Sequence, residues 1–378
     1  MRRALHILLI ACFLGIIAAP PVANLLGADG ADAVAENRAF AEFPGVSATW
    51  ADLSGFFPGL DAWFADHFAF RSTLVRWYGI SRYFWLGVSS SPAVAPAADG
   101  WLFYIEDGGL EDFTNQYPLS EYEIQRWRDA VVRAQRWCRA HGIAYGFTIA
   151  PDKGTIYPEL FPQTARRVNR LSRTDQIITA ITDTGAAIDV RPALMNAKRT
   201  VRLFQKTDTH WNPRGAYVAY TAIIDGLRLQ LPAIPPPKPL SEFELVTRHV
   251  AGMDLAGMMG LKRVLGEEDL RLVPKRPRQY VVREPKWNIV EAGEPRIVTE
   301  IPGSTLPRAV VFRDSFTSAL APFLSEHFSR VVYLWRNDFA VDEVEAEHPD
   351  VVLQELVSRH LQWIEPWPEL IPVIQGSN

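Results

Sequence analysis

The sequence predicts an α/β fold: a doubly wound, mainly parallel sheet with a β-rich insertion, preceded by an N-terminal membrane segment. Three observations predict it. Helical and strand-like patterns alternate along the chain, several strand-like runs are apolar throughout, as in parallel sheets covered on both faces, and the chain opens with a long apolar run. The 378 residues, 48% of them hydrophobic, suffice for a large core.

The N-terminal apolar run follows Arg2 and Arg3 and continues to about Ala23. A membrane-spanning helix needs roughly 20 apolar residues and the core of a signal peptide roughly 7–15, so residues 1–23 fit a signal anchor or a cleaved signal peptide. Lipoprotein processing at Cys12 is a third alternative, disfavoured because apolar residues continue beyond it. The leading positive charges stay inside, so we expect a periplasmic protein that is tethered to the inner membrane when the segment is retained.

Residues 24–60 are rich in Ala, Gly and Pro and predict a linker and entry segment. Residues 61–378 are expected to form one α/β domain. At its start, residues 61–87 carry large apolar side chains at helical spacing, which predicts one amphipathic helix. We expect that helix to pack on the core or to lie near the membrane.

A second helix is predicted over residues 121–141. Ser120 and Glu123 form a capping box, in which each side chain accepts a hydrogen bond from a backbone N–H of the other residue. Gly142 suits the left-handed position that ends a helix. The apolar stripe that this helix should bury consists of Trp127, Val131, Ala134 and Cys138.

The remaining elements alternate in the order expected of a doubly wound sheet. Strands are predicted over residues 100–104, 143–149, 186–190, 308–312, 329–335 and 351–357. Helices are predicted over residues 173–184, 214–229 and 317–327. Residues 240–300 predict the β-rich insertion, with strand-like pieces at 279–282 and 297–301.

Charge and cysteine content exclude several classes of protein. The 39 basic and 43 acidic residues nearly balance, giving a net charge of −4, whereas nucleic-acid binding usually requires a basic excess. Cys12 and Cys138 cannot form a disulfide framework, and no Cys/His cluster indicates zinc. We expect no metal and no cofactor.

Two short motifs carry the candidate chemistry. In an extended Asp208-Thr209-His210 segment, the first and third side chains would project to the same side, so that Asp208 could orient the imidazole of His210. Ser315 occupies a strand-to-helix turn, where a nucleophile is exposed and backbone N–H groups can stabilise an oxyanion. Taken singly, the first motif could be a metal-binding fragment, a cap or a chance pair, and Ser315 could be an ordinary N-cap serine.

Together the two motifs supply a nucleophile, a base and an orienting carboxylate. A serine needs a neighbouring base to take its proton, and open α/β sheets place such groups at the C-terminal ends of strands. Lys153 and Asp152 follow another predicted strand and either contact an anionic sugar or donor or satisfy the backbone of their loop. Arg313 is a further candidate for substrate binding, and Asp314 is expected to hold the turn by hydrogen bonding.

These motifs resemble the SGNH-hydrolase-like proteins of bacterial polysaccharide O-acetylation, the AlgJ/AlgX or DHHW group. The matching pieces occur in the order of that family, from about residue 36 to 360. They are Glu36-Asn37-Arg38, residues 66–71 (DHFAFR), residues 100–104 (GWLFY), residues 151–158 (PDKGTIYP), residues 208–211 (DTHW) and residues 313–316 (RDSF).

The resemblance implies that Asp208, His210 and Ser315 form the catalytic triad, with the Asp-x-His pair before the serine. Arg313 stands where an ordinary SGNH block has glycine, so the oxyanion geometry cannot be transferred. The chain is similar to the single-domain, membrane-associated AlgJ type, since little follows residue 360 that could form a carbohydrate-binding module.

The function implied is transfer of acetyl groups to an exported polysaccharide. The acetyl donor implied is a membrane-bound O-acyltransferase, since acetyl-CoA is absent outside the cytoplasm. Two alternatives remain open: a periplasmic carbohydrate acetylesterase, and a non-catalytic polysaccharide-binding scaffold of a secretion complex.

Overall fold

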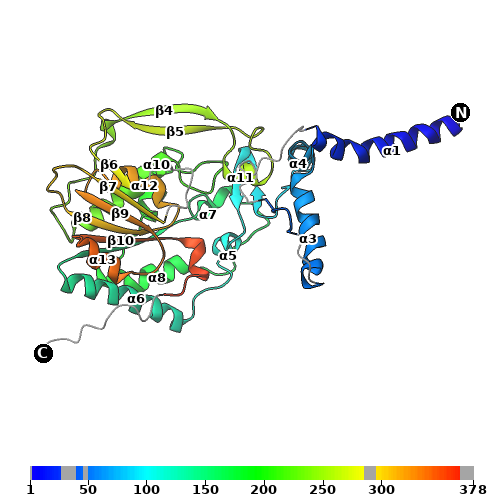
Figure 1. The fold of residues 1–378 in the computed structure, drawn as a ribbon. Coiled ribbons are helices and arrows are strands. Elements are labelled where there is room, and N and C mark those ends of the chain that lie inside the picture. Colours follow the sequence, from blue (N-terminus) through cyan, green and yellow to red (C-terminus); the bar gives the residue numbers. More distant parts are fainter. Residues whose placement is uncertain (1, 27–39, 46–49, 285–294, 367–378) are drawn as a thin grey trace. The chain divides into compact units, whose positions relative to one another are not determined.

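The computed structural model describes residues 2–26, 40–45, 50–284 and 295–366. The chain forms two compact units: one comprises Met1–Pro96 and Ala251–Gly266, the other Ala97–Val250 and Glu267–Asn378 (Figure 1). The motif Glu36-Asn37-Arg38 lies outside the described residues. Residues 61–96, which the sequence places in the α/β domain, belong to the first unit.

The first unit begins with helix α1 (Arg2–Leu25). Its segment Arg2–Ala23 is long and apolar enough to cross a membrane, in agreement with the predicted N-terminal membrane segment. The unit also contains α3 (Trp50–His67), α4 (Arg71–Ile80), the π-helical turn η1 (Ser81–Trp85), β1 (Val94–Pro96) and α11 (Asp254–Met258).

The prediction of one continuous helix over residues 61–87 is wrong. Helix α3 starts at Trp50, inside the expected linker, and the chain breaks between α3 and α4, where Phe70 has a left-handed φ of 66°. The side chain of Arg71 stabilises this break, because its Nε donates to the carbonyl of Ala65 at 2.8 Å. That bond satisfies a carbonyl in the last turn of α3, which the ended helix leaves without an intrahelical partner.

The second unit is built on a six-stranded sheet in the order β3-β10-β8-β9-β7-β6. The first four strands of that order are parallel, and β7 and β6 are added antiparallel at one edge. Their bounds are Ala144–Ala150 (β3), Val351–Val357 (β10), Arg308–Arg313 (β8), Arg330–Trp335 (β9), Arg296–Glu300 (β7) and Val281–Glu284 (β6). The mainly parallel sheet is therefore confirmed.

Helices cover both faces of this sheet, as the doubly wound prediction requires. Helices α6 (Glu121–Ala140) and α8 (Arg173–Ile181) pack together, and so do α10 (Pro213–Arg228) and α12 (Thr317–Leu324) (Figure 1). Phe147 of β3 shares the α6 core with Trp127, whereas a Cβ on its neighbour Gly146 would lie 2.8 Å from Leu227 of α10. Successive strand residues thus face opposite helix layers.

Helix α6 matches its prediction closely. Both bonds of the capping box between Ser120 and Glu123 are present, and Gly142 has a φ of 73°. The predicted apolar stripe is entirely buried: Trp127, Val131, Ala134 and Cys138.

Other predictions need correction. The expected strand over residues 186–190 is only an isolated parallel bridge from Phe147 to Ala187, because just two backbone bonds join this segment to β3. Five short α-helices of the described residues were not predicted: α5 (Gly109–Thr114), α7 (Lys153–Ile156), α9 (Arg191–Ala197), α11 (Asp254–Met258) and α13 (Val341–Glu347).

The β-rich insertion is confirmed. Strands β4 (Phe243–Val250) and β5 (Glu267–Pro274) form an antiparallel pair with Phe243 opposite Pro274, and β6 and β7 join the main sheet. The second unit also contains β2 (Leu102–Tyr104) and the short helix α7 (Lys153–Ile156).

Candidate active site

Ser315 lies on the turn between β8 and α12, within the second unit. Asp314 fixes this turn: its Oδ1 accepts from the backbone N–H of Phe316 at 2.8 Å, and its Oδ2 accepts from that of Val357, the last residue of β10, at 2.6 Å. The predicted role of Asp314 in holding the turn is therefore confirmed. Ser315 is not the N-cap of α12, because Phe316 occupies that position.

A buried glutamate supports the same turn from β10. Glu355 is fully buried, and its Oε2 accepts from the backbone N–H of Asp314 at 3.2 Å and from the Thr317 hydroxyl at 2.8 Å. Burial, followed by the negative charge of Asp314, raises the pKa of the Glu355 carboxyl well above its ordinary value. Burial at this position therefore favours the neutral acid over the carboxylate.

The Asp208–His210 segment is a bend and not the extended strand end expected from the sequence. Asp208 still reaches His210, but through a turn: its Oδ1 accepts from the backbone N–H of His210 at 2.9 Å and from the ring Nδ1 at 2.7 Å. This is a local Asx-type turn, in which a short acidic side chain bonds the backbone two residues on.

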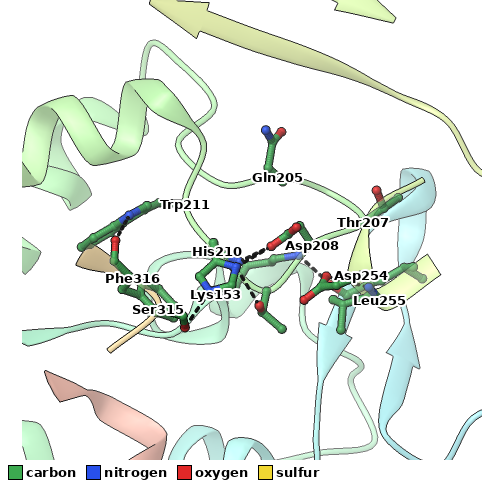
Figure 2. Close-up of polar contacts among 12 residues, drawn as sticks. Lys153, Gln205, Thr207, Asp208, His210, Trp211, Asp254, Leu255, Ser315 and Phe316 are labelled. Carbon is green, nitrogen blue, oxygen red and sulfur yellow. Dashed lines mark hydrogen bonds and ion pairs between the residues drawn. The ribbon is translucent and has the colours of Figure 1, made fainter. Parts of the chain in front are cut away.

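The two segments meet at the imidazole of His210. Its Nε2 lies 2.8 Å from the Ser315 hydroxyl, on the ring edge opposite Asp208 (Figure 2). Because Nδ1 donates to the carboxylate, Nε2 carries the lone pair that can accept the Ser315 proton. Both His210 and Asp208 remain partly exposed, with 30% and 20% of their side-chain surface accessible.

The electrostatics favour a charged Asp208. Burial raises the pKa of Asp208, but the charge and hydrogen bonds of His210 and the charge of Lys153 outweigh burial and hold that pKa below its ordinary value. An ionised carboxylate at this position stabilises the imidazolium that forms when His210 takes a proton.

Phe316, which follows Ser315, contacts both His210 and Trp211 of the segment that carries the base. Its ring is buried and lies 4.9 Å from the imidazole of His210, centroid to centroid, and its carbonyl accepts from Trp211 Nε1 at 3.1 Å. Its backbone N–H, at the helix start where the sequence suggested oxyanion donors, is already donated to Asp314.

Glu267 is a supporting residue that sequence reasoning missed. It is the first residue of β5 and is buried, and its carboxylate accepts from the backbone N–H groups of Lys206 and Thr207, each at 2.8 Å. Its Oε2 also accepts from Arg202 Nη1 at 2.6 Å. No local pattern singles out this glutamate, because its partners lie about sixty positions away in the sequence.

Lys153 also holds this loop, through the carbonyl of Lys206. It is buried, and its Nζ donates to the carbonyls of Leu102 at 2.7 Å and Lys206 at 3.1 Å. Asp152 is bound by Arg359, whose Nη1 lies 2.5 Å from its Oδ1. These contacts match the alternative in which Lys153 and Asp152 satisfy their surroundings.

Lys153 and Asp152 also line a small hollow of about 10 Å³, scarcely room for one water molecule, that reaches Thr209. Asp112 lines it as well, and burial, followed by the charge of Asp152, raises the pKa of Asp112 to about 7. Contact of Asp152 or Lys153 with a substrate stays a prediction.

The side chain of Arg313 does not face the solvent. Only 2% of its surface is exposed, and its guanidinium lies 4.5 Å from the centre of the Trp335 ring. The two residues are cross-strand neighbours in the pairing of β8 with β9, which explains the burial. Direct binding of substrate by Arg313 is therefore not supported.

The fold and this geometry agree with a comparison of the sequence with known families. A family model described as an SGNH hydrolase-like domain, acetyltransferase AlgX, matches residues 94–298. The matched range is more than half of the chain. The chain therefore belongs to this family of SGNH-hydrolase-like acetyltransferases. The range includes Asp208 and His210, and Ser315 follows it. No curated protein sequence matches the chain.

Two solved structures of one protein share the fold at low sequence identity. PatB1 from Bacillus cereus is 17% identical, with a TM-score of 0.53 over 71% of this chain and 96% of PatB1. The same protein with a sulfonyl adduct gives 16% identity and a TM-score of 0.51 over 71% of this chain and 97% of PatB1. The O-acetyltransferase domain of Pseudomonas putida AlgJ is 20% identical, with a TM-score of 0.47, over 72% of this chain and 94% of that domain.

Proposed function

We propose that this protein is an O-acetyltransferase that acetylates an exported bacterial polysaccharide through an acetyl-serine intermediate on Ser315. The observation that carries the proposal is the alignment of three groups: Ser315 Oγ lies 2.8 Å from His210 Nε2, and His210 Nδ1 lies 2.7 Å from Asp208 Oδ1. Membership of the acetyltransferase family supports the same reaction class.

The first half of the proposed reaction attaches the acetyl group to Ser315. His210 Nε2 takes the Ser315 proton while Oγ attacks the carbonyl carbon of the acetyl donor. The bond between that carbon and the leaving group breaks, and His210 returns the proton to the leaving group. Asp208 keeps its charge throughout and stabilises the transient imidazolium of His210.

The second half of the proposed reaction transfers the acetyl group from Ser315 to the sugar. A sugar hydroxyl gives its proton to His210 and attacks the acetyl carbon, and Ser315 leaves as it regains a proton from His210. We propose a membrane-bound O-acyltransferase as the donor and place the reaction in the periplasm, with the N-terminal helix as the tether to the inner membrane. Asp152 and Lys153 are proposed to border the substrate.

The test uses an activated ester, p-nitrophenyl acetate, with the full chain. Mass spectrometry is expected to find an acetyl group on the peptide that contains Ser315, and Ser315→Ala is expected to lower the turnover by at least about 10³-fold. Ser318→Ala, three residues further on in α12, is the matched control and should label normally. Equal labelling of the wild type and Ser315→Ala would exclude the intermediate.

An acetylesterase would use the same three residues with water as the acceptor. The two reactions are separated by supplying an acetylated donor with and without an oligosaccharide. A transferase should release less acetate and form an acetylated sugar when the acceptor is present, whereas an esterase should release the same amount. A non-catalytic scaffold predicts that Ser315→Ala leaves polymer acetylation intact.

A further inference from the structure

The helical segment formed by α4 and the turn η1 has one apolar face that packs within the first unit. A Cβ at Gly79 would lie 2.5 Å from the carbonyl oxygen of Met259, and a Cβ at Gly260 would lie 2.7 Å from Cγ1 of Val75. The hydroxyl of Ser90 also donates to the Met259 carbonyl at 2.8 Å. This face is therefore covered by the segment Ala251–Gly266.

A second face of the same segment is apolar and exposed. Leu74, Trp77 and Tyr78 are 54%, 60% and 53% exposed, and their spacing of i, i+3 and i+4 places them together on α4. Phe84 and Trp85, which are 55% and 74% exposed, follow Trp77 and Tyr78 by about two helical turns. A surface helix normally presents polar residues to water, so this aromatic face indicates an interaction surface.

The segment that carries the aromatic face is basic in sequence, although Arg71 is paired with Asp66, its Nη2 lying 3.8 Å from Oδ1. Residues 67–98 contain no Asp or Glu and three arginines, Arg71, Arg76 and Arg82. Arg82 lies over the Tyr78 ring, with its Cζ 5.6 Å from the ring centre, and so brings positive charge beside an exposed aromatic side chain. A basic segment with Trp, Tyr, Phe and Leu on one face is typical of helices that lie in a membrane interface.

We propose that the aromatic face, Leu74, Trp77, Tyr78, Phe84 and Trp85, binds the surface of a bilayer with anionic headgroups. Trp and Tyr favour the boundary between headgroups and acyl chains, and Arg82 beside Tyr78 supplies a positive charge that attracts anionic lipid. The first unit also contains the candidate membrane span Arg2–Ala23. A tether of this kind raises the local concentration of lipid, so that even weak adsorption of the aromatic face becomes effective.

This proposal uses the membrane location of the proposed function but not its chemistry. The test places a photo-crosslinking amino acid, p-benzoylphenylalanine, at position 85 of the full chain in vesicles of phosphatidylethanolamine and phosphatidylglycerol. The control places it at Tyr122, which is 72% exposed on α6. Lipid crosslinks are expected to be several-fold more abundant from position 85.

A charge reversal tests the headgroup preference. The double variant Arg76→Glu with Arg82→Glu should lower the lipid crosslinking several-fold, whereas Arg136→Glu, at an exposed site of α6, should not. Equal lipid crosslinking from positions 85 and 122 overturns the proposal. In native membranes, crosslinks from position 85 that reach only protein and no lipid also overturn it. Ser315→Ala should leave lipid crosslinking unchanged, so failure of the acetylation chemistry stays distinguishable from failure of the lipid contact.

Discussion

The two halves of the candidate active site are held in different ways. The Ser315 turn continues directly from β8 and is bonded to the end of β10 through Asp314, so the sheet itself places the hydroxyl. The Asp208–His210 bend belongs to no sheet strand. Side chains from distant segments, Glu267 and Lys153, hold the backbone that leads into it.

The Ser315 turn thus belongs to the main sheet, whereas the loop that carries His210 is held partly by Glu267 of the β-rich insertion. The nucleophile lies on a turn that continues directly from a sheet strand, and the side chains of Asp314 and Glu355 beside it support that turn. The base depends on a few buried charged groups, each of which is costly to lose, because the partner left behind is a buried polar group without a bond. Variants of the loop side should therefore affect catalysis more than variants that support the turn.

Among the residues that position the nucleophile and the base, the largest effect is expected for Asp208→Asn. The amide keeps the shape of the side chain but removes the charge that fixes the His210 tautomer, so transfer should slow by roughly 10²–10⁴-fold. Rates of acetyl transfer measure this loss. Asp225→Asn, at an exposed site of α10, serves as the control, and a similar small change in both variants would contradict an orienting role for Asp208.

An intermediate effect is expected for Glu267→Gln. The amide cannot accept from both Lys206 and Thr207 and from Arg202 at full strength, so we expect a loss of about 1–3 kcal/mol in stability. Displacement of the loop should also lower kcat by roughly 10–100-fold. Urea unfolding and steady-state kinetics measure the two losses.

Glu268→Gln is the matched control for Glu267→Gln. The neighbouring side chain is exposed, so its replacement should change neither quantity. If Glu267→Gln destabilised the protein without changing kcat, Glu267 would support the fold and not the position of the base.

The smallest effect is expected for Glu355→Gln. Burial raises the pKa of this carboxyl and so favours its protonated form, which a neutral amide resembles, and the replacement should therefore cost less than about 1 kcal/mol. In the unfolded protein, the Glu355 carboxyl releases its proton above its ordinary pKa of about 4.3, whereas in the folded protein its raised pKa retains the proton. The free energy of unfolding therefore falls as the pH rises beyond that value.

The pH dependence separates Glu355→Gln from an ordinary loss of packing. The decline in unfolding free energy above about pH 4.3 should be smaller in the variant, because the amide does not titrate. Urea unfolding over a series of pH values measures it. An unchanged pH slope, or a large loss of stability at pH 7, would mean that Glu355 is charged in the folded protein.

Local patterns were sufficient for the parts of the fold that depend on nearby residues. The apolar stripe and capping box defined α6, and the apolar run of β8 followed by a turn located Ser315. The pairing of Asp208 with His210 was also expected, although the bend that produces it was not. Its shape depends on contacts with Glu267, far along the chain, which spacing alone cannot reveal.

Two other features could not be predicted from the sequence, because they too depend on tertiary contacts. The break at Phe70 places a bulky residue in a left-handed conformation, where sequence patterns favour glycine. Arg313 ends an apolar strand and reads as a surface residue, yet its strand neighbour Trp335 covers it. Both outcomes are decided by tertiary contacts.

The position of Glu267 at the first residue of β5 has a consequence for engineering. The antiparallel pair of β4 and β5 is a discrete segment that could be exchanged between relatives. A graft that lacks a carboxylate in this register would release the loop that carries His210, and a loss of turnover would then be misread as changed specificity. Chimeras should retain Glu267 while the rest of the hairpin is varied.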